Sequence, residues 1–237
     1  MQSTVTIVAS TARSPRIEAV GALAVRRTGP DRVHLIGSAA TPLGGDVIDV
    51  RIVVEAGATL DIRTVAASVA LPGRSTNISH ASWTVEVEDG GVLTFDPEPT
   101  IVAGSADHRT ATTLAVGANA RVVLRERVQL GRSGEVSGRW AGSVNVDGPD
   151  GPVLRHRLEL GSGADGHDIL FAPMASASTF TWPDATTDGV EGGVDQGLWA
   201  AMPVAGGGMF STWLGHRLAS CQPARLASAP TPDVASS

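Results

Sequence analysis

Three acidic residues of this chain stand where a carboxylate can do chemistry. Glu126 lies inside an apolar alternation, Glu135 closes the motif G-R-S-G-E, and Asp46 follows two glycines. Two carboxylates brought together in a cleft can act as a general acid and a general base, and carboxylate oxygens also bind divalent metal ions. The chemistry that applies depends on the elements that position these three residues.

Glu126 is predicted to face the apolar side of a strand. If a strand begins near Arg121, Glu126 shares one face with four aliphatic residues, namely Val122, Leu124, Val128 and Leu130. A carboxylate on that face needs an arginine partner, backbone hydrogen bonds, a proton or a wet cavity, because an unpaired buried charge is costly. Two interpretations stay open: a structural Arg–Glu pair, and an acid facing an internal polar channel.

Glycines punctuate the segments that hold the three acids. Gly44 and Gly45 precede Asp46 and allow a positive φ or a close backbone approach, as in a tight turn or a bulge. Gly131 and Gly134 follow the strand of Glu126 and mark a turn before the next strand begins near Trp140.

Asp107 and His108 are of metal-ligating types, but they fall in the polar segment 104–110, which is predicted to be a loop. An adjacent pair in such a loop is expected to be solvated. The six histidines of the chain form no compact ligand motif.

Composition excludes several function classes. The net charge of -6 and a pI near 5.5 argue against a nucleic-acid-binding surface. The absence of lysine rules out a Walker A phosphate loop, a Schiff-base enzyme and a Ser-x-x-Lys nucleophile. A single cysteine, Cys221, a poor signal peptide and no long apolar stretch favour a cytoplasmic protein that does not enter a membrane.

The elements around these residues are predicted to be strands. Ile17–Arg27 and Arg32–Ile36 form a hairpin across T-G-P-D. A unit of extended run, glycine turn and extended run then recurs at 53–63, 85–95 and 114–124, as in successive hairpins or β-coils.

The clearest helix candidate is Met209–Cys221, whose apolar residues recur at three- and four-residue spacing. Its stripe would pack on a sheet or form a docking face for a partner through Phe210, Trp213 and Leu214. The predicted fold is mainly β, a single β-rich domain of repeated hairpins or β-coils at 15–222 with a few short helices. Residues 1–14 are expected to be flexible and 223–237 disordered.

Several motifs together resemble those of the urease accessory protein D family, called H in some bacteria. The resemblance runs in the same order over residues 15–160, and G-R-x-x-G-E after an acid-bearing strand is its most specific part. The motifs are P-L-G-G-D at 42–46, V-V-E-A-G-A at 53–58, P-E-P-T-I at 97–101 and R-E-R-V-Q-L-G-R-S-G-E at 125–135. The segment 62–73 departs from the family pattern and keeps only Thr64.

The resemblance implies a chaperone and not an enzyme. Members of the family bind accessory protein F, which binds the GTPase accessory protein G, and the assembly docks on nickel-free urease and helps load nickel. A hetero-oligomer follows, with a dimer of heterocomplexes as one arrangement. No tightly bound cofactor is implied, and nickel is in transit through an internal water-filled passage.

Carried over by motif, the resemblance assigns Asp46, Glu126 and Glu135 to the lining of that passage. Ions in transit need weak, exchangeable ligands, since a closed site would trap them. Arg132 is expected to hold one of these acids by a charge-assisted hydrogen bond. Two alternatives stay open: a β-rich hydrolase or lyase that uses Asp46 with Glu135, and a generic protein-binding domain.

Overall fold

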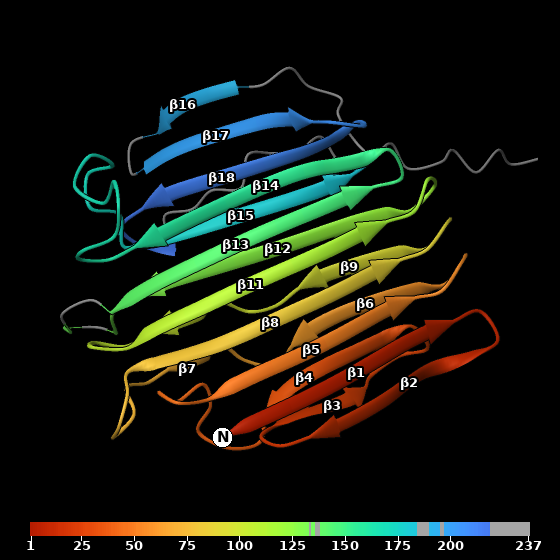
Figure 1. Ribbon diagram of the computed structural model, residues 1–237, viewed down its shortest axis with the longest axis horizontal. Helices are drawn as coiled ribbons and strands as arrows, with labels where there is room; N and C mark the ends of the chain where they lie inside the picture. The colour runs from red at the N-terminus through yellow and green to blue at the C-terminus, as the bar shows by residue number, and fades with distance from the viewer. Residues whose placement is uncertain (133, 136–137, 184–189, 195–196, 219–237) are drawn as a thin grey trace, which may run out of the picture.

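The computed structural model describes the chain except residues 133, 136–137, 184–189, 195–196 and 219–237. The elements of the described part are all strands, and Figure 1 shows them as two layers whose strands run in similar directions. The prediction of a mainly β fold is therefore confirmed. No described helix is long and apolar enough to cross a membrane.

The first sheet has seven strands in the order β14-β13-β11-β8-β5-β1-β2. Their bounds are β1 Gln2–Ser10, β2 Arg13–Val20, β5 Val47–Val54, β8 Ile78–Val87, β11 Asp107–Val116, β13 Arg139–Gly148 and β14 Gly151–Leu160.

The second sheet has nine strands along its main path, in the order β16-β17-β18-β15-β12-β9-β6-β4-β3, with β10 and β7 joined beside β12. Their bounds are β3 Leu23–Arg27, β4 Arg32–Gly37, β6 Thr59–Thr64, β7 Ser68–Ala70, β9 Val92–Asp96, β10 Thr100–Val102, β12 Arg121–Leu130, β15 Ala175–Trp182, β16 Val190–Val194, β17 Gly197–Val204 and β18 Gly208–Gly215.

The repeated unit of the sequence builds β-coils, not hairpins. Each repeat begins on the first sheet and ends on the second, as β5–β6, β8–β9 and β11–β12. Gly57 and Gly90 make two of the crossings with φ values of 70° and 67°. Successive coils pair in parallel on both sheets, which gives a solenoid-like middle to the domain.

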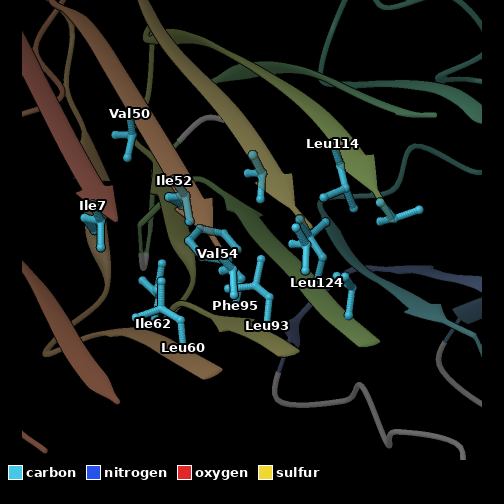
Figure 2. Packing of buried hydrophobic residues seen from close by; sticks show 14 of the residues in the cluster. Ile7, Val50, Ile52, Val54, Leu60, Ile62, Leu93, Phe95, Leu114 and Leu124 are labelled. Carbon is cyan, nitrogen blue, oxygen red and sulfur yellow. The ribbon is translucent and has the colours of Figure 1, made fainter. Parts of the chain in front are cut away.

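Alternating side chains from both sheets fill the interior. The main hydrophobic cluster includes Ile52, Leu60, Leu93 and Leu124, several of which Figure 2 shows in contact across the layers. A second, smaller cluster includes Val128, Leu130 and Trp140. Glu126 lies on β12 between Leu124 of one cluster and Val128 of the other, on the same face, so the predicted alternation of this strand is confirmed.

The expectation for the N-terminus was wrong. Residues 1–14, predicted to be flexible, contain β1, which lies between β5 and β2 with Val5 and Ile7 fully buried. The alternation T-V-T-I-V-A is that of a half-buried strand. The predicted strand Ile17–Arg27 is also divided, because Gly21, at a φ of 99°, separates β2 from β3.

The prediction of a C-terminal helix was also wrong, and its last residues lie outside the described part. Residues 208–215 form β18 between β15 and β17. Met209 and Phe210 are both buried although they point to opposite faces, so the strand is apolar on both sides. Apolar residues of both parities reproduce the three- and four-residue spacing of a helix.

Candidate functional site

A cavity of about 380 Å³ lies between the two sheets, next to Glu126. Its wall on the first sheet includes His108 and Thr110 of β11, and its wall on the second sheet includes Glu126 of β12. Phe95 and Leu124 also line the cavity and belong to the core drawn in Figure 2.

The cavity reaches the surface where the second sheet is interrupted. The pairing of β12 with β9 ends at Leu124, and its pairing with β10 begins at Val128. Pro97 and Pro99 stand between β9 and β10 and lack the N–H groups that a continuous ladder needs. Exposed residues of the segment 65–67 line the cavity at the same place, so we identify this interruption as its mouth.

Glu126 is held by a hydroxyl group and not by an arginine. Thr110 Oγ1 donates a hydrogen bond of 2.8 Å to Glu126 Oε1. Arg125 and Arg127, the neighbours of Glu126 on β12, also contribute to the lining of the cavity, but both of them pair with Asp96. Among the described residues, no arginine forms an ion pair with Glu126. The interpretation as a structural Arg–Glu pair was wrong, and the structure instead shows an acid that lines a cavity.

Burial raises the pKa of Glu126 to about 7, and the hydrogen bond from Thr110 opposes that rise only in part. Near neutral pH this carboxyl group is therefore present in both its protonated and its charged form. A group poised in this way can release and take up a positively charged ligand without holding it tightly.

His108 is part of a strand and not of a solvated loop. The predicted loop 104–110 ends at Ala106, β11 begins at Asp107, and His108 is only 2 % exposed. Its Nδ1 is 2.9 Å from Ser79 Oγ of the neighbouring strand β8. Burial, with a smaller contribution from the neighbouring His80, lowers the pKa of His108 to about 4 against the opposing effect of Asp107. The ring is therefore neutral at physiological pH.

Glu98 adds an exposed carboxylate to the lining of the cavity at its mouth. Its backbone N–H donates a hydrogen bond of 2.8 Å to Thr64 Oγ1, which ties the end of β6 to the segment between β9 and β10. From the sequence, Glu98 and Thr110 were not singled out, and His108 was expected to be a solvated loop residue. Glu98 could have been found from the motif P-E-P, and Thr110 from its inward-facing position in the strand.

Asp46 is buried, but it lines neither this cavity nor the second one described below. It accepts hydrogen bonds from Leu43 N–H at 2.9 Å and Thr41 Oγ1 at 3.0 Å, and it pairs with the amino group of Met1. Burial alone would raise the pKa of Asp46, but these partners together lower it. All of them hold the loop that precedes β5, so Asp46 has a structural role in the described part.

The glycines before Asp46 have the two properties expected of them. A Cβ on Gly44 would meet Thr76 O at 2.0 Å, which shows a close backbone approach, and Gly45 has a φ of 93°.

Glu135 faces a separate groove of about 710 Å³. It accepts hydrogen bonds from the guanidinium of Arg132 and from the backbone N–H groups of Arg132 and Gly104. The Arg132 guanidinium, helped by the Gly104 N–H, lowers the pKa of Glu135 to about 2. The predicted pairing with Arg132 is confirmed. Gly131 and Gly134 have φ values of 73° and 79° in this turn.

The structure thus places the three predicted acids in three different environments, and only Glu126 lines the central cavity. Asp46 and Glu135 form no acid–base pair in a shared cleft, which leaves the hydrolase alternative without its site. In the described part of the chain, no group of three or more His, Cys, Asp or Glu side chains could hold a metal ion. Any ion in the cavity would meet few protein donors.

The predicted docking residues are packed inside the domain. Phe210 is 1 % exposed, with its ring centroid 4.6 Å from that of His156, and Trp213 is 3 % exposed. Leu214 packs against the second hydrophobic cluster. Phe210 and Trp213 therefore offer no exposed surface to a partner.

Comparison with known proteins gives one consistent answer. A family model described as UreD urease accessory protein matches residues 8–226. Urease accessory protein UreD 1 of Saccharopolyspora erythraea is 40 % identical over 187 residues, which cover 78 % of this chain and 72 % of that protein. Urease accessory protein UreD of Parafrankia sp. is 36 % identical over 228 residues, which cover 84 % of this chain and 76 % of that protein.

Proposed function

Because this chain belongs to the UreD urease accessory protein family, with the role in urease maturation that the family name implies, we propose that it assists the insertion of nickel into urease. In this proposal the nickel ion is cargo, and the cavity between the two sheets is part of its route. The chain acts as a scaffold in the cytoplasm and performs no catalytic step of its own.

The observation that supports the proposal most directly is the position of Glu126. An acid on the core side of a sheet costs free energy of folding unless it is paired with a cation or hydrated. The partner of Glu126 is a neutral hydroxyl group, and Glu126 faces a cavity. An ion route gains a carboxylate that can bind and release a divalent cation.

The other donors of the cavity fit a cation in transit. Glu98 lies at the mouth and Glu126 lies between the two sheets, so an entering ion meets one carboxylate and then the other. Nickel binds oxygen and imidazole donors, and a small number of protein ligands leaves water in the remaining positions. Binding is then weak enough for the ion to move on.

We further propose that the partners are urease accessory proteins F and G and nickel-free urease, in a hetero-oligomer. GTP hydrolysis belongs to a partner in this scheme, since a chain without lysine has no phosphate loop of the Walker A type. The cavity mouth would then need to be continuous with a passage in the neighbouring protein.

Co-expression with the other accessory proteins and the urease subunits tests this function. Pull-down of the tagged chain measures assembly, and metal analysis of purified urease measures nickel loading. We expect Glu126→Gln to assemble normally and to deliver less nickel, whereas Glu18→Gln, the same change on an exposed part of β2, leaves both unchanged. A chain that captures neither accessory protein F nor urease would contradict the scaffold role.

A further inference from the structure

His108 occupies a position in the cavity that the proposed route does not yet use. It stands two residues before Thr110 on β11, and both side chains point inward. Residues two apart on a strand lie about 6.6 Å from each other on the same face. Thr110 donates a hydrogen bond to Glu126, so His108 on the first sheet and Glu126 on the second line facing walls of the same cavity.

Ser79 fixes the orientation of this ring. The register of β8 and β11 pairs His108 directly with Ser79, and the hydroxyl group of Ser79 engages Nδ1 at 2.9 Å. Nε2 is the remaining ring nitrogen, and the described residues give it no hydrogen-bond partner. A histidine that binds a metal ion through one nitrogen characteristically donates the N–H of the other to a neighbouring polar group, which fixes its tautomer.

The ring is also in the correct protonation state to bind a cation. Its burial, which lowers the pKa of His108 to about 4, keeps the imidazole neutral at physiological pH. When Nδ1 donates its proton to Ser79 Oγ, Nε2 carries a free lone pair. Because His108 is only 2 % exposed and lines the cavity, we place this lone pair on the cavity side of the ring.

We propose that His108 Nε2 is a nitrogen donor for the divalent cation in this cavity, positioned by Ser79, and that with Glu126 it favours nickel-like ions over Mg²⁺ and Ca²⁺. Oxygen donors alone suit Mg²⁺ and Ca²⁺, whereas an imidazole suits nickel, copper and zinc. The inference rests on the proposed function for the identity of the cargo. It assigns the selectivity of the cavity to a residue other than the acids.

The alternative is that Ser79 and His108 only satisfy each other inside the fold. Metal binding by the full-length chain separates the two roles. Equilibrium dialysis with NiCl₂ gives the affinity, and X-ray absorption at the nickel edge detects imidazole in the coordination shell. The variants are His108→Gln and Ser79→Ala, and His80→Gln is the matched control because His80 is exposed on the same strand as Ser79.

We expect His108→Gln to weaken nickel binding by at least about 10-fold and to remove the imidazole signal, and Ser79→Ala to weaken it by about 10-fold while keeping the imidazole. His80→Gln leaves the cavity site unchanged, and a thousand-fold excess of MgCl₂ does not displace nickel from the wild-type chain. Unchanged affinity and unchanged imidazole signal in folded His108→Gln would overturn the inference. If that variant does not fold, unchanged affinity in Ser79→Ala overturns it.

The same experiments distinguish this inference from the proposed function. Nickel loading of urease that depends on Glu126 but not on His108 would refute the role of His108 and leave the route intact. If nickel binds through His108 but the Glu126→Gln variant still loads urease normally, the route through the cavity is refuted. The binding site at His108 then remains.

Discussion

Thr110 and Glu126 join the two sheets through a single hydrogen bond of 2.8 Å across the interior. Thr110 belongs to β11 of the first sheet and Glu126 to β12 of the second, in the same coil of the chain. The contact lies between the two hydrophobic clusters, so it marks a polar layer in an otherwise apolar core. Because the polar layer adjoins the cavity, changes at these two residues report on the proposed route.

The raised pKa of Glu126 makes stability depend on pH. The pKa is about 7 in the folded chain against an ordinary value of 4.5, so the folded state binds more protons between these values. Stability should therefore fall as pH rises through this window. Glu126→Gln removes the penalty and should be more stable than the wild type at pH 8 by up to about 3 kcal/mol, with the advantage lost below pH 4.5. Urea unfolding across this range measures it, and a difference that does not change with pH would be evidence against the assignment.

Thr110→Val keeps the shape of the side chain and removes the hydroxyl group. The pKa of Glu126 should rise further, because the hydrogen bond from Thr110 is the interaction that lowers it. A double-mutant cycle with Glu126→Met, which keeps the length of the side chain but has no oxygen acceptor, should give a coupling of about 1.5–3 kcal/mol at pH 8, as for a hydrogen bond to a charged group. Thr113→Val, at an exposed position of the same strand, should show no coupling. A coupling near zero would mean that the contact does not form in solution.

Glu135→Gln tests the separation of the two cavities. This acid holds the backbone N–H groups of Gly104 and Arg132, so its replacement should speed hydrogen exchange at both amides. Nickel loading of urease should stay at the wild-type level, because Glu135 does not line the cavity of Glu126. A loss of nickel as large as that in Glu126→Gln would show that the groove belongs to the route.

Asp46→Asn should destabilise the fold by about 3 kcal/mol at neutral pH, because the buried carboxylate holds Leu43 N–H and Thr41 Oγ1. The pKa of Asp46 is lowered, so its contribution is present above the ordinary value of 3.8 and is lost as pH falls below it. Thermal unfolding at pH 7 and pH 3 measures this, with Asp49→Asn on the outer side of β5 as the control. Equal destabilisation at both pH values would contradict the assigned role.

Local patterns of the sequence predicted much of the fold. The alternation around Glu126 located β12 and its inward acid, and the repeats located the three coils of the middle. The sequence could not decide between hairpins and coils. The two strands of each repeat lie on different sheets and pair with strands of neighbouring repeats, not with each other. Pairing between coils is a long-range property that the pattern of one repeat does not contain.

The site was only partly predictable for the same reason. Glu126 was found by parity, but its partner Thr110 lies on the opposite sheet and His108 owes its burial to the strands on both sides of β11. Asp46 and Glu135 share the chemistry of Glu126, yet their hydrogen bonds to nearby backbone groups give them local tasks. Residue type alone cannot separate a turn acid from a cavity acid.

The most direct test of the account is the nickel content of urease matured with Glu126 variants at equal levels of assembled complex. We expect Glu126→Gln to leave assembly intact and to lower nickel per urease active site at least several-fold. Glu126→Asp, which keeps a carboxyl group, should restore part of the loss. Full nickel loading by an assembled Glu126→Gln complex would contradict the claim that nickel passes this carboxylate.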